Sequence, residues 1–214
     1  MRKERKEYVH YREIQRERIL TASEELFIRN GIQAVSVDTI ANAAQMTRKT
    51  FYQYFQNKEE VARAILEKFQ EIRDREFHEN VKLKGNGYER LEIAVYDMCG
   101  MLDHHPDHVR FMVEFSALFA QNHETSVDGL LEVYSDAQNI FLQQIERGIG
   151  DGSIAARNTP EIMASAIINL IMGLISRFSL LGERTVEASG ISASELLRET
   201  CRIFLLGMKQ EDGE

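Results

Sequence analysis

The chain has 214 residues, of which 43% are hydrophobic and 28% are charged, and its formal net charge is −8. This suffices for one or two globular domains with a proper core, and the presence of only 2 prolines favours long helices over a sheet protein. The two cysteines, Cys99 and Cys201, are far apart in the sequence and form no CxxC motif. Secreted disulfide staples and a cysteine zinc site are therefore disfavoured, and a reducing cytoplasm fits.

Charge is distributed unevenly along the chain. Residues 1–60 carry 11 Lys and Arg against 9 Asp and Glu, whereas residues 61–214 carry 15 against 25. A mildly basic head on an acidic body indicates that only the head meets a polyanion. We therefore expect two domains, 1–60 and 61–214. The N-terminal segment MRKERKEYVHYREIQRER has no apolar core and is not a signal peptide. Its first basic residues either follow DNA phosphates or form a disordered tail.

The head shows the start and stop signals of four helices. Apolar residues spaced for one helix face begin at Ile14 and end before Asn30-Gly31, where glycine can take the left-handed conformation that closes a helix. Ser36 is a good N-cap for a second, short helix. Thr47 caps a third helix that we expect to run to about Gln56. Asn57 caps a fourth, which continues to about Phe77.

Only Gln45 and Met46 separate the second helix from the third. Two short helices joined by so tight a turn cannot pack antiparallel, so they cross steeply. This is the helix-turn-helix arrangement, whose second helix fits a major groove about 12 Å wide.

The third helix mixes cations and aromatic rings in the stretch TRKTFYQYF. Phe51 and Phe55 are four residues apart and should face the core, whereas the polar side chains between them point elsewhere. Arg48 and Lys49 lie in the first turn, where cations slightly destabilise an isolated helix, and this argues for an external anion. Lys58, at the start of the next helix, is placed for a further phosphate. We interpret the stretch as a recognition helix.

Residues 19–61 resemble the DNA-binding region of the TetR (tetracycline repressor) family of transcriptional regulators. The residues that carry the resemblance are Ala22, Leu26-Phe27 and Gly31, then Ile40-Ala41 and Ala44, and finally TFYQYF followed by Lys58-Glu59.

The resemblance implies an all-α homodimer, with an N-terminal three-helix helix-turn-helix head joined to a helical bundle that binds a small molecule and dimerises. Two heads bind a palindromic double-stranded DNA operator, and the small molecule releases the DNA, as in a repressor. An activator or an effector-independent regulator shares the same head and stays an alternative. No cofactor is implied. By family position, the DNA contacts fall on Ser36, Thr47, Arg48, Lys49, Tyr52, Tyr54 and Lys58, with Gln53 as a further candidate.

Two residues depart from the family pattern. The family usually has glycine in the turn where this chain has Gln45. A non-glycine residue held left-handed there costs on the order of 1 kcal/mol, so we expect the turn to relax and the helix angle to change. Lys49 stands where a small residue is common, and an added phosphate or guanine contact there would shift the operator preference.

The sequence of the acidic body predicts helices with short breaks at KGNG, DHHP, NHETS, GIGDGS and GERT. A clear start is NTPEIMA, in which Thr159 caps and Pro160 takes the first helical position. The run 162–181 approaches the length of a membrane span, but Asn169 and Arg177 interrupt it, so we favour a bundle helix and no membrane. The resemblance implies that helices 160–181 and 192–208 form the homodimer interface.

No nucleotide-binding or hydrolase signature occurs in the body, so we expect no enzyme. The resemblance implies that the region of DHVRFMVEFSALFAQN lines the effector cavity, where a Met-rich wall can repack around different ligands. Glu114 either pairs with a cationic ligand or with Arg110, and Asn169 either lines the cavity or bonds across an interface. The candidate effector contacts are Met101, Phe111, Glu114, Phe115, Leu118, Phe141 and Asn169.

A second hypothesis, from a different class, is a helical metal-dependent enzyme that uses the cluster DHHPDH. His104 and His108 are four residues apart, a spacing that can share a metal ion on one helix, with His105 beside them. Pro106 is expected to start a new helix between them, which spoils this geometry. We therefore expect no metal site, and read the cluster as a surface turn followed by a helix start.

Overall fold

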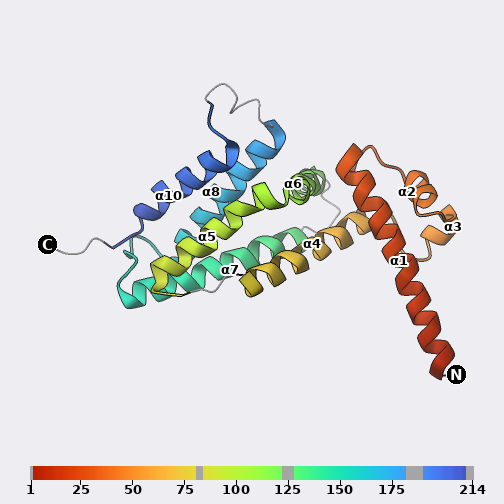
Figure 1. Ribbon diagram of the computed structural model, residues 1–214, viewed down its shortest axis with the longest axis horizontal. Helices are drawn as coiled ribbons and strands as arrows, with labels where there is room; N and C mark the ends of the chain where they lie inside the picture. The colour runs from red at the N-terminus through yellow and green to blue at the C-terminus, as the bar shows by residue number, and fades with distance from the viewer. Residues whose placement is uncertain (1, 81–83, 122–127, 182–189, 211–214) are drawn as a thin grey trace. The chain divides into compact units, whose positions relative to one another are not determined.

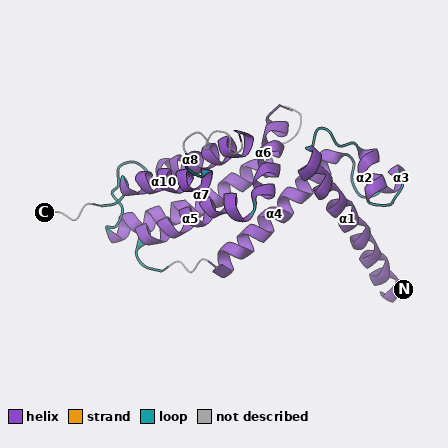
Figure 2. Cartoon of the chain, turned by 45° about the horizontal axis from the view of Figure 1, so that its top comes forward, coloured by secondary structure: helices purple, strands orange, loops and turns teal. Residues whose placement is uncertain are grey.

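The computed structural model describes residues 2–80, 84–121, 128–181 and 190–210, and its regular elements within these ranges are all helices (Figures 1 and 2). This confirms the predicted all-α fold. The chain divides into two compact units, Met1–Ile72 with Glu114–Thr125 and Arg73–Val113 with Ser126–Glu214. The first unit is longer than the predicted head of residues 1–60, because the start of the fourth helix packs with it.

The first unit is built from four helices. They are α1 (Arg2–Asn30), α2 (Val37–Ala43), α3 (Arg48–Phe51) and the beginning of α4 (Lys58–Asn80). Helix α1 begins well before the apolar period at Ile14, since its first residues are mostly Arg, Lys and Glu, which are good helix formers. Gly31 has φ +81° and closes α1 in the left-handed conformation, as predicted.

The core of the first unit contains both predicted aromatic residues of the TRKTFYQYF stretch. Phe51 is 0% exposed and Phe55 is 2% exposed, and their ring centroids are 6.1 Å apart. Phe27 of α1 and Ile40 of α2 are buried as well. The apolar underside of α3 is thus in the core, and its remaining side chains face outwards.

Helix α3 is shorter than predicted. It ends at Phe51 and not near Gln56, and the chain continues in tight turns. The N–H groups of Gln53 and Tyr54 donate to carbonyls three residues back, a tightening that commonly ends a helix. The chain must also turn before α4, because the Asn57 side chain accepts the N–H of Glu60 at 2.8 Å as its cap.

The turn between α2 and α3 keeps a left-handed residue although no glycine is present. Gln45 has φ +55°, and it is the only non-glycine residue with positive φ in the described parts of the chain. Its N–H donates to Asn42 O, and the N–H of Met46 donates to Ala41 O. This pair of bonds is the Schellman motif, which normally favours glycine at the left-handed position. The turn therefore does not relax, and the chain bears the cost of Gln45.

The second unit contains the remaining helices. They are α5 (Gly87–His104), the first half of α6 (Pro106–Gln121), α7 (Asp128–Asp151), α8 (Pro160–Leu181) and α10 (Ala193–Leu206), with α5 packed against both α7 and α10. Asn86 and Glu89 form a capping box at the start of α5. The Thr159 hydroxyl accepts the N–H of Ile162 at the start of α8, as expected for its cap.

Helix α8 explains the most apolar run of the chain. Within the described residues, Pro160–Leu180 is the one segment long and apolar enough to cross a membrane. The helix packs against α7 and α10, so its apolar composition is that of a bundle helix. Its buried side chains are Met163, Ala164, Ile167, Ile168, Ile171, Ile175 and Phe178.

The predicted break at GIGDGS starts later than expected, because α7 continues through Gly148 to Asp151. A Cβ atom at Gly87 of α5 would lie 2.1 Å from the backbone nitrogen of Gly148. No side chain fits there, so Gly87 lets the backbones of α5 and α7 meet directly. A Cβ atom at Gly148 would instead lie 2.4 Å from the Ile154 side chain, so Gly148 makes room for Ile154 within the continued helix.

The left-handed Gln45 predicts an unusual gain in stability from glycine. Gln45→Gly should raise the free energy of unfolding by about 0.5–1 kcal/mol, because glycine has no Cβ to strain the turn. Gln45→Val should lower it, since a β-branched residue fits positive φ poorly. Urea denaturation followed by circular dichroism measures both. Gln56→Gly, at an exposed position without positive φ, is the control and should destabilise. A destabilising Gln45→Gly would contradict this account of the turn.

Candidate nucleic-acid interface

The two short helices of the head are held by hydroxyl caps. The Ser36 hydroxyl accepts the N–H of Thr39 at 3.1 Å, and the Thr47 hydroxyl accepts the N–H of Thr50 at 3.1 Å. Each hydroxyl also lies 2.8 Å from the threonine hydroxyl three residues on. Ser36 and Thr47 are exposed, so each combines a structural role with a hydroxyl on the outer face.

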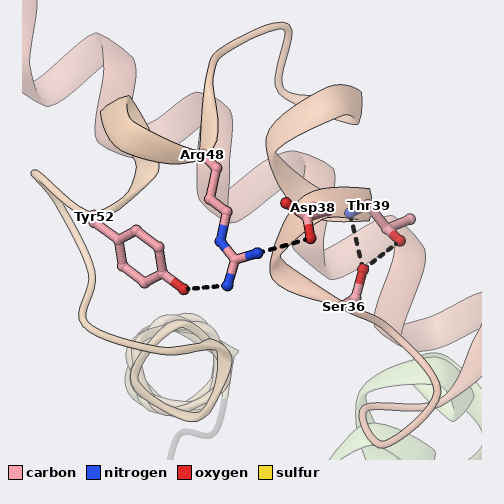
Figure 3. Close-up of polar contacts among 5 residues, drawn as sticks. All are labelled: Ser36, Asp38, Thr39, Arg48 and Tyr52. Atoms are coloured by element: carbon pink, nitrogen blue, oxygen red, sulfur yellow. Dashed lines mark hydrogen bonds and ion pairs between the residues drawn. The ribbon is translucent and has the colours of Figure 1, made fainter.

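Arg48 is held between two side chains on this outer face (Figure 3). Its guanidinium donates to the Asp38 carboxylate at 3.1 Å and to the Tyr52 hydroxyl at 3.2 Å. The hydrogen bond to Tyr52, and then the charge of Asp38, raise the pKa of Arg48. The arginine therefore stays charged and its direction is set before any partner arrives.

The arrangement has an electrostatic consequence for a polyanion. Asp38 and Arg48 are both more than half exposed, so their ion pair is screened and weak. A phosphate or a guanine edge can replace Asp38 as the partner of the guanidinium. The Asp38 carboxylate positions Arg48 and would repel a phosphate placed next to it.

Three arginines of α1 contact the end of α2 and the residues that follow α3. The Arg12 guanidinium donates to Gln53 O at 3.1 Å, and its Cζ lies 5.4 Å from the Tyr54 ring centroid. Arg16 lies 5.1 Å from the Phe55 ring centroid. Arg18 donates to Ala44 O at 2.9 Å, at the C-terminal end of α2. The sequence analysis missed these contacts, although the spacing of Arg12 and Arg16 on one helix face was a usable signal.

Lys58 has a different setting from the other predicted DNA contacts. Its ammonium donates to Ile32 O and Gln33 O at 2.8 Å and to Val35 O at 2.9 Å. An ammonium has three hydrogens, and all three are used here. Lys58 thus ties the segment that follows α1 to the start of α4, and a phosphate contact requires exchange of one of these bonds. Its DNA contact stays a prediction.

The other predicted DNA contacts lie on the same unit. Lys49 and Gln53 are exposed, Tyr52 is 46% exposed, and Tyr54 is partly buried beneath Arg12. Together with Arg48 they place two cations, two phenols and an amide within seven consecutive residues. Such groups supply the donors that phosphate oxygens and base edges accept.

The predicted effector contacts do not all gather at one place. Met101 and Phe141 line a cavity of about 30 Å³ in the second unit, together with Phe77, Ala94, Met98 and Ile140. Arg73, Asp74 and Asp97 supply its polar wall. Asp97 is exposed as a residue, but partial burial of its carboxyl group, and then Glu76, raise its pKa.

The remaining effector candidates lie elsewhere. The Glu114 carboxylate accepts the N–H of Ile32 at 3.3 Å, within the first unit. Asn169 is exposed on α8 and donates to Ser165 O at 2.8 Å. Phe111 and Phe115 are buried, and Leu118 is partly buried. As ligand contacts these five residues stay predictions.

The histidine cluster shows the predicted interruption. Pro106 begins α6, so His104 and His108 lie on different helices. His105 Nε2 lies 3.0 Å from a Glu76 carboxylate oxygen, and its ring stacks on His108 with centroids 5.2 Å apart. In the described ranges, no three His, Cys, Asp or Glu side chains are arranged to hold a metal ion.

Comparison with known proteins assigns the class of the molecule. Residues 19–65 match the model of the bacterial regulatory proteins of the tetR family. This range contains the turn, α3 and the start of α4, so the class is that of a transcription regulator with a DNA-binding helix-turn-helix. The match lies in the head and confirms that residues 19–65 resemble the DNA-binding region of the TetR family.

Solved structures share the fold over nearly the whole chain. A TetR-family regulator from Agrobacterium tumefaciens has a TM-score of 0.71 at 15% identity, and covers 92% of this chain and 99% of its own. FadR from Bacillus subtilis, solved with stearoyl-CoA, has a TM-score of 0.69 at 18% identity, with 90% and 98% covered. SmeT, the repressor of a Stenotrophomonas maltophilia multidrug efflux pump, has 0.67 at 18%, with 92% and 91% covered.

Replacing Lys58 and Lys49 separately distinguishes an effect on stability from an effect on DNA binding. Lys58→Met should lower the free energy of unfolding by about 1.5–3 kcal/mol, because three carbonyls lose a charged donor. Lys49→Met, at an exposed position, should change it by less than about 0.5 kcal/mol and instead weaken DNA binding. Urea denaturation and fluorescence anisotropy with labelled DNA measure the two effects. Equal stability of the two variants would overturn the role given to Lys58.

Proposed function

We propose that the protein is a repressor that binds a palindromic operator as a homodimer in the cytoplasm and is released from DNA by a small molecule. The observation that carries the proposal is the outer face of α3, where Arg48, Lys49 and Tyr52 stand exposed above a buried aromatic underside. A helix presented in this way can enter a major groove and place its cations on bases and phosphates.

The proposed DNA contacts have distinct roles. Arg48 reads a base edge or binds a phosphate through its paired N–H groups, and Tyr52 holds its guanidinium in place. Lys49 neutralises a phosphate as a point charge. Ser36, Thr47, Gln53 and Tyr54 contribute hydroxyl and amide hydrogen bonds, and Lys58 does so after exchange of one carbonyl partner. Because phosphate contacts release counterions, operator affinity should fall steeply with salt.

Dimerisation is proposed through α8 and α10. Both helices carry large apolar side chains on their outer faces, and Ile203 is 61% exposed. A second copy would remove these side chains from water. It would also hold two heads about 34–36 Å apart, the spacing of adjacent major grooves on one side of DNA. The exposed apolar residues of these helices are Ile162, Leu180, Leu196, Ile203 and Leu206.

Release is proposed to start at the cavity lined by Met98, Met101 and Phe141. Its volume of about 30 Å³ holds a single water, whereas ligand pockets have volumes of roughly 300–1,000 Å³. The effector must therefore repack the wall, which flexible methionine side chains permit. Asp74 is already paired with Arg73 at 2.7 Å, so Asp97 is the lining carboxylate that would favour a cationic group on the effector. An effector that prefers the form with the wrong head spacing weakens DNA binding by linkage.

Removal of the two recognition cations tests the DNA-binding role. Arg48→Ala with Lys49→Ala should lower operator affinity on the order of 100-fold or more and reduce its salt dependence, because base and phosphate contacts are lost. A genome-wide selection of bound DNA fragments with the wild type supplies the operator, and anisotropy titrations measure the affinity. Arg75→Ala with Lys84→Ala removes the same charge from exposed sites of the second unit and is the control. Equal operator affinities for both double variants would contradict the proposed DNA-binding role of Arg48 and Lys49.

A charge on the outer face of α10 tests the dimer. Ile203→Asp should leave the helix content unchanged, because the side chain is mostly exposed, but shift the protein towards monomers. Operator affinity should fall about tenfold or more, since two linked heads bind more tightly than one. Sedimentation velocity and the anisotropy titration provide the readouts. A dimer of unchanged strength would show that this face is not the interface.

A further inference from the structure

The two cysteines of the chain, 102 positions apart in the sequence, meet in the core of the second unit. Cys99 lies on α5 and Cys201 on α10, and their sulfur atoms are 3.6 Å apart. Both are free thiols, 0% and 2% exposed. A disulfide has a sulfur separation of about 2.05 Å, so the sulfurs need to approach by only about 1.5 Å. Neighbouring helices can supply such a movement through side-chain rotation.

The two thiols share one hydrogen bond and are therefore unequal. Cys99 donates its S–H to Cys201 Sγ, which lowers the pKa of Cys201, and the same bond and burial raise the pKa of Cys99. Thiolates, not thiols, are the nucleophiles of cysteine chemistry. The pair thus contains one sulfur prepared to react and a second in position to resolve the product.

A surface groove lies near the buried pair, although neither cysteine lines it. An open surface groove of about 660 Å³ is bordered by Tyr96 and by Arg198 and Arg202 of α10. The charge of Arg198 acts on Cys99, and the titration of Tyr96 is linked to both thiols, so the groove lies close to the sulfurs. A molecule of the size of a peroxide needs only a brief opening of this wall to reach them.

We propose that Cys99 and Cys201 form an oxidisable dithiol site that closes a reversible disulfide between α5 and α10, with hydrogen peroxide as the oxidant. The Cys201 thiolate attacks a peroxide oxygen, the O–O bond breaks, and the leaving hydroxide takes up the proton that Cys201 has lost, so a sulfenic acid and one water form. The Cys99 sulfur then attacks the Cys201 sulfur, the S–O bond breaks, and the leaving hydroxide takes the Cys99 proton and departs as a second water. Two thiols are oxidised by two electrons in total, and one hydrogen peroxide is reduced to two waters.

The disulfide would fasten α10 to α5. In the reduced protein, the contact between these helices depends on apolar packing around Val95, Leu197 and Leu205, which belong to the same core cluster as the cysteines. A covalent link across so long a loop restricts the unfolded chain strongly. The oxidised protein should therefore melt at a higher temperature than the reduced protein.

The test uses the full-length protein, purified with reductant, freed of it and treated with a small excess of hydrogen peroxide. After alkylation of the remaining thiols, intact mass spectrometry should show a product about 2 Da lighter than the untreated chain and without alkyl groups. Proteolysis without reductant should yield the peptide of Cys99 linked to that of Cys201, and dithiothreitol should restore both thiols. This experiment needs no variant and does not depend on DNA binding.

Two variants assign the chemistry to the pair. Cys99→Ser and Cys201→Ser should form no intramolecular disulfide, and peroxide should not raise their melting temperature, in contrast to the wild type. The thiol left in Cys99→Ser should react faster than the one left in Cys201→Ser. The proposal is overturned if both wild-type thiols are still alkylated after treatment, if each sulfur gains oxygen instead, or if the disulfide joins two chains.

Discussion

The head depends on one backbone conformation, the left-handed Gln45 between α2 and α3. The Schellman bonds of Gln45 and Met46 end α2 abruptly, and only Thr47 follows before α3 begins. A right-handed residue at position 45 would continue α2 and carry Arg48 and Lys49 away from the outer face. The cost of a side chain at positive φ is thus borne at the point that directs the recognition residues.

Helix α3 cannot stand alone, because a four-residue helix has no stability of its own in water. Its position comes from its surroundings, because Phe51 and Phe55 are buried in the core. Arg12 of α1 donates to the carbonyl of Gln53 just after the helix, and Arg16 lies over the Phe55 ring. Tyr52 and Asp38 then orient Arg48 on the exposed side. Side chains that are already held in place would lose little conformational freedom on binding DNA. The same number of contacts would then give a higher affinity.

The local features of the fold could be predicted from the sequence, and the long-range contacts could not. The hydroxyls of Ser36, Thr47 and Thr159 each accept the backbone N–H three residues on, so the pattern that predicts these caps lies in neighbouring residues. The buried Phe51 and Phe55 follow from helical spacing for the same reason.

The Cys99–Cys201 pair and the contact of Glu114 with Ile32 join residues more than eighty positions apart. No periodicity reveals such neighbours. The three carbonyl partners of Lys58 were not predicted for a related reason: a lysine near a DNA-binding helix looks the same in sequence whether or not it also bonds carbonyls of its own chain. Of the effector candidates, Met101 and Phe141 line the described cavity, and the sequence alone identifies apolar faces but not which faces enclose a cavity.

The crossing of Gly87 and Gly148 governs how the second unit can deform. Backbone meets backbone there, so α5 and α7 can neither approach further nor slide without a clash. Ala94 and Phe141, on the two helices, border the cavity about 10 Å along the axes, and Met98 lies farther out. A ligand inserted at the cavity would push α5 and α7 apart there, while the contact between Gly87 and Gly148 acts as a fixed pivot. The helix ends beyond the cavity would therefore move farther than the residues that line it.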